Sequence, residues 1–104
     1  MMHISNIYDE LGWEKAEGYP VGTKIKTLRE EEGKKTILMK IPKEFYMEPH
    51  SHIYNEQHLV LEGEYESERK IFSSGTYRLI PAHKDHGPFS SNSGALILII
   101  WDSL

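Results

Sequence analysis

The stretch Pro49-His50-Ser51-His52-Ile53-Tyr54-Asn55-Glu56-Gln57-His58 carries the most information about this sequence. Residues two apart on a strand point to the same face, so His50 and His52 would present two imidazoles side by side. Glu56 follows after an expected kink at Tyr54-Asn55, because Asn tolerates a tight backbone. Two imidazoles and a carboxylate in this arrangement are suited to chelating one divalent transition metal.

A His-x-His pair is weak evidence when it stands alone, because the chain has six histidines among 104 residues. Two solvated strand histidines explain the pair equally well. A second group of residues strengthens the metal interpretation. Gly75 permits a turn with positive φ, and Pro81 fixes a bend at a strand end. His86 then begins a short extended segment, from which its side chain could reach the same ion.

The length predicts a single domain over residues 1–104, with an N-terminal arm at 1–18 and a motif-bearing core at 40–102. The formal charge of −4 argues against a nucleic-acid surface, which needs clustered basic residues. The chain has no cysteine, which excludes disulfides and thiolate metal sites.

The sequence also bears on location. Its start shows no basic region followed by an apolar stretch, so no secretory signal is visible. The longest apolar run, residues 95–101, is far short of a membrane span. We therefore expect a cytoplasmic protein with no membrane partner. Because this run is apolar on both faces, we expect a strand buried on both sides, either inside the fold or against a partner subunit.

The secondary-structure signals are mostly those of strands and turns. Residues 4–13 are compatible with a helical turn capped by Ser5, or with a tail or edge strand. Further along, we expect a loop at 45–49 and a turn at Glu62-Gly63-Glu64. The expected strands are 23–29, 35–41, 57–61, 65–72, 76–80, 86–90 and 95–101. Many short strands with frequent turns are typical of an all-β sandwich or barrel.

Both groups of residues together resemble the two motifs of the cupin superfamily. The first motif is matched by His50, His52, Glu56 and Gly63, and the second by Gly75, Pro81 and His86. The resemblance spans about residues 40–102. It implies an all-β cupin-type double-stranded β-helix, or jelly-roll barrel. It also implies that the four metal ligands are His50, His52, Glu56 and His86.

Two residues depart from the second motif. His83 stands where the motif usually has Gly, and Ser90 where it has Asn. A His at position 83 is either strained or part of a loop of different form, and we expect it to be a loop residue instead of a ligand.

Within the superfamily the chain resembles the ChrR-like group, through residues 59–65, 75–77 and 81–90. Members of that group act as sensor domains or as small metal proteins that stand alone. No sigma-binding helical domain precedes the motifs in this sequence, so an anti-sigma role is not expected. The resemblance to cupins also suggests a homodimer.

His58 shares its strand parity with Glu56, so we expect it to point into the barrel. Three roles are open. It could orient Glu56 or a metal-bound water, it could shuttle protons as a catalytic residue, or it could be a hydrogen-bonded core residue. Phe45 and Met47 could form the wall of a substrate pocket, although an ordinary core role is the simpler interpretation.

Three imidazoles and one carboxylate suit Zn, Fe(II), Mn, Ni, Co or Cu, but not Ca. Four protein ligands would complete a tetrahedral zinc site, whereas an octahedral metal would keep two positions open. We therefore expect either a dioxygenase-like metalloenzyme acting on a small molecule or a non-catalytic metal-binding sensor domain. A metal that only stabilises the fold is a third alternative.

Overall fold

The computed structural model describes residues 4–102, which contain β-strands and no α-helix. The prediction of an all-β fold is therefore confirmed. The strands are β1 (Glu14–Lys15), β2 (Lys24–Glu31), β3 (Lys34–Ile41), β4 (Phe45–Met47), β5 (Asn55–Ser67), β6 (Lys70–Ser73), β7 (Tyr77–Ile80), β8 (Phe89–Ser91) and β9 (Ala95–Asp102).

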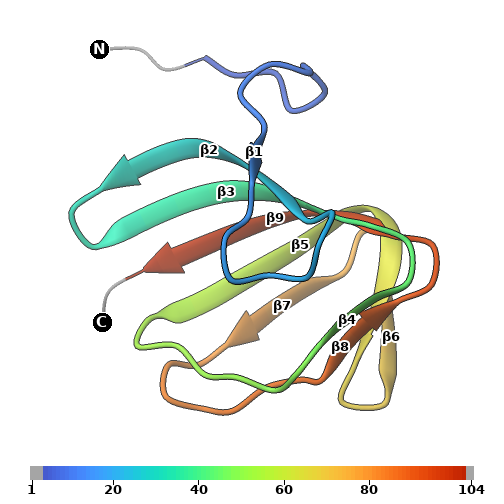
Figure 1. Cartoon of the computed structure of the whole chain (residues 1–104). Helices are drawn as coiled ribbons and strands as arrows, with labels where there is room; N and C mark the ends of the chain where they lie inside the picture. Colours follow the sequence, from blue (N-terminus) through green and yellow to red (C-terminus); the bar gives the residue numbers. More distant parts are fainter. Residues whose placement is uncertain (1–3, 103–104) are drawn as a thin grey trace.

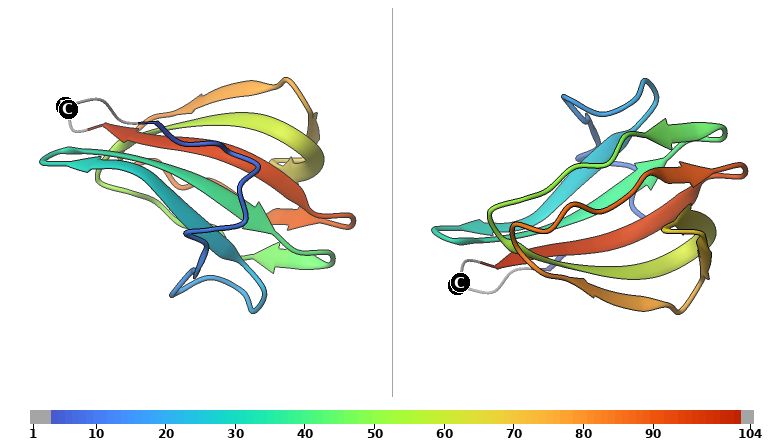
Figure 2. Two further views of the ribbon diagram at one scale, coloured as in Figure 1. Left: turned by 90° about the horizontal axis from the view of Figure 1, so that it is seen from above. Right: turned by 90° about the horizontal axis from the view of Figure 1, so that it is seen from below.

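The long strand β5 organises the barrel, because it pairs with four other strands. Its first half lies between β9 and β7, and its last residues pair with β6 and β8. Beyond β9 the sheet continues through β3 and β2 to the short edge strand β1, and beyond β8 it continues to β4. Every pairing is antiparallel, and the strands curl around a common interior (Figures 1 and 2).

The predicted turn at Glu62-Gly63-Glu64 is wrong, since all three residues lie within β5. The register of β5 against β9 shifts between Val60 and Glu62, and Gly63 has a φ of 74°. A side chain at position 63 would collide with the carbonyl oxygen of Gly94. The glycine therefore bends a continuous strand around the closely approaching backbone of Gly94, instead of ending it.

The strand expected over 65–72 is interrupted by a turn at Glu68-Arg69. These residues have φ values of 54° and 67°, as in the two-residue type I′ turn that joins β5 to β6. Neither residue is Gly or Asn, so the sequence carried no signal for this turn. The loop expected over 45–49 is also partly wrong, because Phe45–Met47 forms β4 and pairs with β8.

The N-terminal segment forms turns over residues 4–13, so the predicted helical turn and the alternative edge strand are both absent there. The edge strand comes later, as β1. The Lys26 ammonium donates hydrogen bonds to the carbonyl oxygens of Asn6 and Asp9, at 3.1 and 3.2 Å. This lysine fastens the segment to β2. The first three residues of the predicted arm, and the last two of the chain, lie outside the described residues.

The core is built from alternate side chains of β3, β5 and β9, together with aromatic residues of β4 and β8. Its members are Ile37, Met39, Ile41, Phe45, Val60, Tyr65, Phe89, Ala95, Ile97 and Ile99. β9 lies between β3 and β5, and its consecutive residues Ala95, Leu96 and Ile97 are all buried. The prediction that the final strand is buried on both faces is therefore confirmed at its start.

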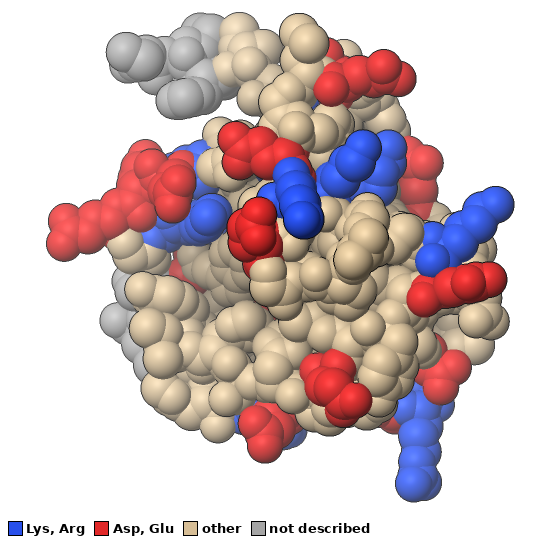
Figure 3. Space-filling model, in the orientation of Figure 1, with Lys and Arg blue, Asp and Glu red and all other residues tan. Residues whose placement is uncertain are grey.

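The outer surface carries acidic and basic side chains side by side on the face shown in Figure 3. Two of the ion pairs lie near the β2–β3 hairpin, where Arg29 contacts Glu31 and Lys35 contacts Glu30. Residues 4–102 include no helix with the length and apolarity that crossing a bilayer requires.

Candidate metal centre

The backbone brings the two predicted motifs together at one end of the barrel. His50 and His86 form an isolated antiparallel bridge, with N–H···O distances of 3.0 and 2.9 Å in the two directions. The His83 N–H donates to the carbonyl oxygen of His52 at 2.7 Å, which is a second backbone link between the segments that carry the two motifs. The segment before β5 and the segment before β8 are therefore held side by side.

Three of the four predicted ligands form a group that could hold a metal. Ligand atoms of His50, His52 and His86 all lie within 4.8 Å of one another. The ring centroid of His50 is 4.7 Å from that of His52 and 4.5 Å from that of His86. His50 Nδ1 lies 3.3 Å from the carbonyl oxygen of Glu48. Because a carbonyl only accepts, this contact places the proton on Nδ1 and leaves Nε2 free as a ligand atom.

Glu56, near the start of β5, lies beside this group. Its Oε2 atom lies 3.2 Å from His52 Nε2 and 3.5 Å from His86 Nε2. Within residues 4–102, none of these three buried atoms has a hydrogen-bond partner of suitable geometry. Buried polar atoms without partners are rare, and here they face one another. An imidazole and carboxylate donor set of this kind fits a divalent transition metal.

Burial keeps two of the imidazoles neutral. It lowers the pKa of His86 to about 4, although the nearby carboxylate of Glu56 opposes the shift. Burial lowers the pKa of His52 as well, again against the charge of Glu56. Only a neutral imidazole offers a lone pair to a metal, so both side chains are in the binding form at neutral pH.

Glu56 is held as a carboxylate in spite of its burial, with 3% of its surface exposed. Burial raises the pKa of Glu56. The hydrogen bond from His58 and the positive charge that the neighbouring histidines can carry lower this pKa, and together they outweigh the effect of burial. The net pKa lies below the ordinary value. The site therefore places the neutral imidazoles of His52 and His86 beside one negative charge.

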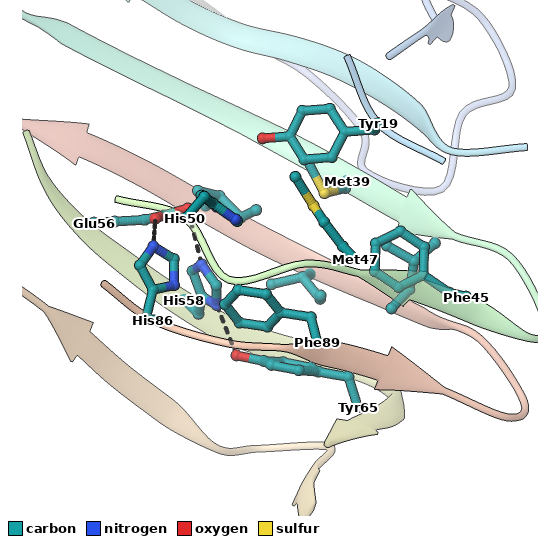
Figure 4. Close-up of a pocket in the computed structure, with 13 residues that line it drawn as sticks. Tyr19, Met39, Phe45, Met47, His50, Glu56, His58, Tyr65, His86 and Phe89 are labelled. Carbon is teal, nitrogen blue, oxygen red and sulfur yellow. Dashed lines mark hydrogen bonds and ion pairs between the residues drawn. The ribbon is translucent and has the colours of Figure 1, made fainter. Parts of the chain in front are cut away.

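His58 points into the barrel beside Glu56, as its parity predicts. Its Nε2 lies 3.0 Å from Glu56 Oε1, and its Nδ1 lies 2.6 Å from the Tyr65 hydroxyl (Figure 4). Both ring nitrogens are thus engaged. Tyr65 was not singled out from the sequence, since no motif marks it.

Two hollows flank the histidines. The inner one is a cavity of about 40 Å³ with mainly apolar walls, which include Phe45 and Met47 as the sequence suggested. Phe45 also belongs to the core. The outer one is a groove of about 440 Å³ between His52, Trp101 and the β2–β3 hairpin.

Tyr19 lines both hollows and was not singled out from the sequence. Burial, with a smaller contribution from the charge of Glu56, raises the pKa of its hydroxyl to about 12. The Tyr19 hydroxyl is therefore neutral at physiological pH.

His83 is an exposed loop residue and does not belong to the histidine group, in agreement with the prediction. Its φ of 63° is the left-handed conformation that a glycine would adopt without strain. The loop therefore keeps the backbone conformation that a glycine suits, although a histidine occupies the position.

Comparison with known proteins identifies a family to which the sequence is similar. The model of the family described as "ChrR Cupin-like domain" matches residues 3–102. No curated protein matches the sequence.

Solved structures of low sequence identity share the fold. An RmlC-like cupin from Shewanella frigidimarina has a TM-score of 0.76 at 19% identity, covering 100% of this chain and 96% of that one. The anti-sigma protein ChrR of Rhodobacter sphaeroides, in complex with SigE, has a TM-score of 0.77 at 22% identity. That match covers 91% of this chain but only 51% of the ChrR structure, so this chain spans about half its length.

An acetylacetone dioxygenase from Acinetobacter johnsonii has a TM-score of 0.79 at 12% identity, covering 98% of this chain and 77% of that one. At these identities the structures show the fold alone. They confirm that the barrel is of the cupin type.

Proposed function

Because this chain belongs to the ChrR cupin-like family, we propose that it holds one divalent transition metal and acts with it on a small molecule. The ligands in this proposal are His50, His52, Glu56 and His86, and the metal is Zn, Fe, Mn or Ni. The supporting observation is the convergence of His52 Nε2, His86 Nε2 and Glu56 Oε2 as buried atoms without hydrogen-bond partners.

The bound metal would supply Lewis-acid or oxygen-activating chemistry, as in a dioxygenase-like oxidoreductase. The protein supplies the surroundings. His58 contacts Glu56, apolar side chains line the inner cavity, and Tyr19 lines both the cavity and the outer groove. The groove of about 440 Å³ is within the usual size range of small-molecule sites, which supports a small organic ligand. The resemblance to a dioxygenase in fold is consistent with this reaction class.

A non-catalytic sensor is the second candidate. The inner cavity, at about 40 Å³, has room for about three water molecules, which is small for an organic substrate. Four protein ligands around a tetrahedral zinc would leave no open position. The structural likeness to ChrR agrees with this alternative.

Metal analysis tests the proposal. We expect protein purified without a metal-binding tag to contain about one equivalent of a transition metal per chain, by elemental analysis. His50→Ala and His86→Ala should each lower that content strongly. The exposed loop variant His83→Ala is the matched control and should keep it. Unchanged metal content in both ligand variants would contradict the proposed site.

The identity of the metal then separates the two functions. A redox-active metal, together with oxygen consumption in the presence of small diketones or flavonols, would support the enzyme. Stoichiometric zinc that exchanges slowly, with no effect of these compounds on oxygen, would support the sensor.

Two further parts of the proposal concern the setting of the protein. We propose a homodimer, because the outward face of β5, β7 and β9 is largely apolar around Gln57. Its apolar side chains are Leu59, Tyr77, Leu79, Leu98 and Ile100. Light scattering after gel filtration would measure the mass directly. We also propose a cytoplasmic location, which cell fractionation would test.

A further inference from the structure

A continuous series of hydrogen bonds runs from the candidate metal centre to Arg78 on β7. It begins at Glu56 Oε1, passes through both nitrogens of His58 and reaches the Tyr65 hydroxyl (Figure 4). Arg78 Nη1 completes it, 3.2 Å from the same hydroxyl. Glu56, His58 and Tyr65 are buried, with 3%, 5% and 2% of their surfaces exposed. Water therefore has no access to compete for these contacts.

The chemistry of the two end groups fixes the direction of these hydrogen bonds, because a guanidinium only donates and a carboxylate only accepts. Arg78 therefore donates to the Tyr65 oxygen. The Tyr65 O–H is then free to donate to His58 Nδ1. In a neutral imidazole the other nitrogen carries the proton, so His58 Nε2 donates to Glu56 Oε1. One arrangement of protons satisfies every group, and it ends on the carboxylate.

This arrangement divides the two oxygens of Glu56 between different tasks. Oε1 is held by His58, whereas Oε2 has no hydrogen-bond partner and faces His52 and His86. We propose that Tyr65 and Arg78 are positioning residues of the metal site, which hold the His58 ring through Nδ1 and thereby aim Glu56 Oε2 at the metal. This inference rests on the proposed function, because it requires Glu56 to be a ligand.

Arg78 is itself fixed in place, as a positioning residue requires. Its guanidinium lies 4.2 Å from the Phe72 ring centroid, and its side chain is only 13% exposed. An ion pair of 3.9 Å with Glu68 lies on its outer side. The turn at Glu68-Arg69 pairs β6 with the end of β5, which places Phe72 beside Tyr65 and under the Arg78 guanidinium.

The direct test is Tyr65→Phe, which keeps the buried ring and removes only the hydroxyl. Loss of a group that orients a metal ligand typically costs about 10- to 100-fold in metal affinity, and we expect a loss in this range from chelator competition with Zn²⁺. Val60→Ala is the control, because Val60 is buried on the same strand but lies outside the chain of hydrogen bonds. We expect it to lower stability and leave Zn²⁺ affinity unchanged. Wild-type affinity in Tyr65→Phe, or an equal loss in both variants, would overturn the inference.

Arg78→Met provides a second test, since it keeps a long side chain over Phe72 without a donor. It should weaken Zn²⁺ binding in the wild-type background. It should have no further effect in the Tyr65→Phe background, because Arg78 acts only through the tyrosine. Two coupled residues give this non-additive result, whereas independent effects on the fold would add.

The hydrogen bond to His58 Nδ1 separates this inference from the proposed function. Nitrogen NMR of the metal-free protein should show His58 protonated on Nε2 in both the wild type and Tyr65→Phe, with an Nδ1 chemical shift that changes when the Tyr65 donor is lost. A protein that binds no metal would refute the proposed function and, with it, the role in metal binding. A protein that binds metal, but whose His58 Nδ1 chemical shift and Zn²⁺ affinity are both unchanged in Tyr65→Phe, would refute the positioning role alone.

Discussion

The behaviour of individual residues at the metal centre follows from their burial. His86 has both ring nitrogens buried without hydrogen-bond partners among the described residues, and its pKa is lowered to about 4. His52 is shifted in the same direction, and Glu56 remains ionised beside them. A proton on either imidazole would need a partner that the apolar surroundings do not supply, except for the single charge of Glu56.

The metal-free protein should therefore lose stability in mild acid. His86 has a pKa of about 4 when folded and an ordinary value near 6.5 when unfolded, so between these values the unfolded chain binds more protons. The free energy of unfolding is then highest above the unfolded value and falls as the pH is lowered toward 4. Urea unfolding at a series of pH values measures this slope.

The variant His86→Gln removes the titrating group and should flatten the acid slope, leaving the smaller contributions of His52 and Glu56. His83→Gln, which changes an exposed histidine, should keep the slope of the wild type. An identical slope in His86→Gln and the wild type would show that the buried imidazole does not cause it.

At this scale the sequence predicted the candidate ligands but not the residues that hold those ligands in place. The two-residue spacing of His50 and His52, and the second motif around His86, predicted a histidine group that the structure brings together. Tyr65 and Arg78 were missed, because a hydrogen bond between side chains on different strands leaves no spacing pattern in a single sequence.

At the scale of elements, β5 explains why the parity rule succeeded at its start and failed further on. Glu56, His58 and Val60 alternate as buried residues, as the period of two requires. The register shift after Val60 then exchanges the two faces, so the buried residues that follow are Tyr65 and Ser67. The sequence shows Gly63 but does not distinguish a bend within a strand from a turn between two strands.

The bend at Gly63 should be far more sensitive to substitution than a glycine in an open turn. In Gly63→Ala the new Cβ would strike the carbonyl oxygen of Gly94 and lie 2.9 Å from Ala95 Cα, in a backbone conformation with a φ of 74°. Since backbone atoms cannot easily move aside, we expect a loss of about 3 kcal/mol or more in the free energy of unfolding.

Gly75→Ala is the matched comparison, because its φ is also positive at 95° but nothing lies within 4 Å of the new Cβ. It should cost only the conformational strain, about 1–2 kcal/mol. Chemical denaturation of both variants measures the difference. Equal losses would mean that the close approach of the Gly94 backbone contributes nothing.

At the scale of the whole molecule, the candidate ligands come from three places in the chain. His50 and His52 precede β5, Glu56 lies within it, and His86 precedes β8. Within the described residues, the backbone links between the two loops are the His50–His86 bridge and the bond from His83 to His52. A metal held by these ligands would therefore add a further link between the two loops.

Metal removal should consequently act on both global and local stability. A metal present at about 100 times its dissociation constant stabilises the folded state by about 2.7 kcal/mol, equivalent to a rise in Tm of roughly 10–20 °C for a chain of this size. Chelation should reverse this rise in the wild type and have no effect on His86→Ala. Hydrogen exchange should show where the effect is concentrated, with the segments 49–54 and 81–88 opening first in the metal-free protein and the amides of β3 and β9 changing least. If exchange instead accelerated uniformly along the chain, the metal would stabilise the barrel as a whole and would not act as a local link between the two loops.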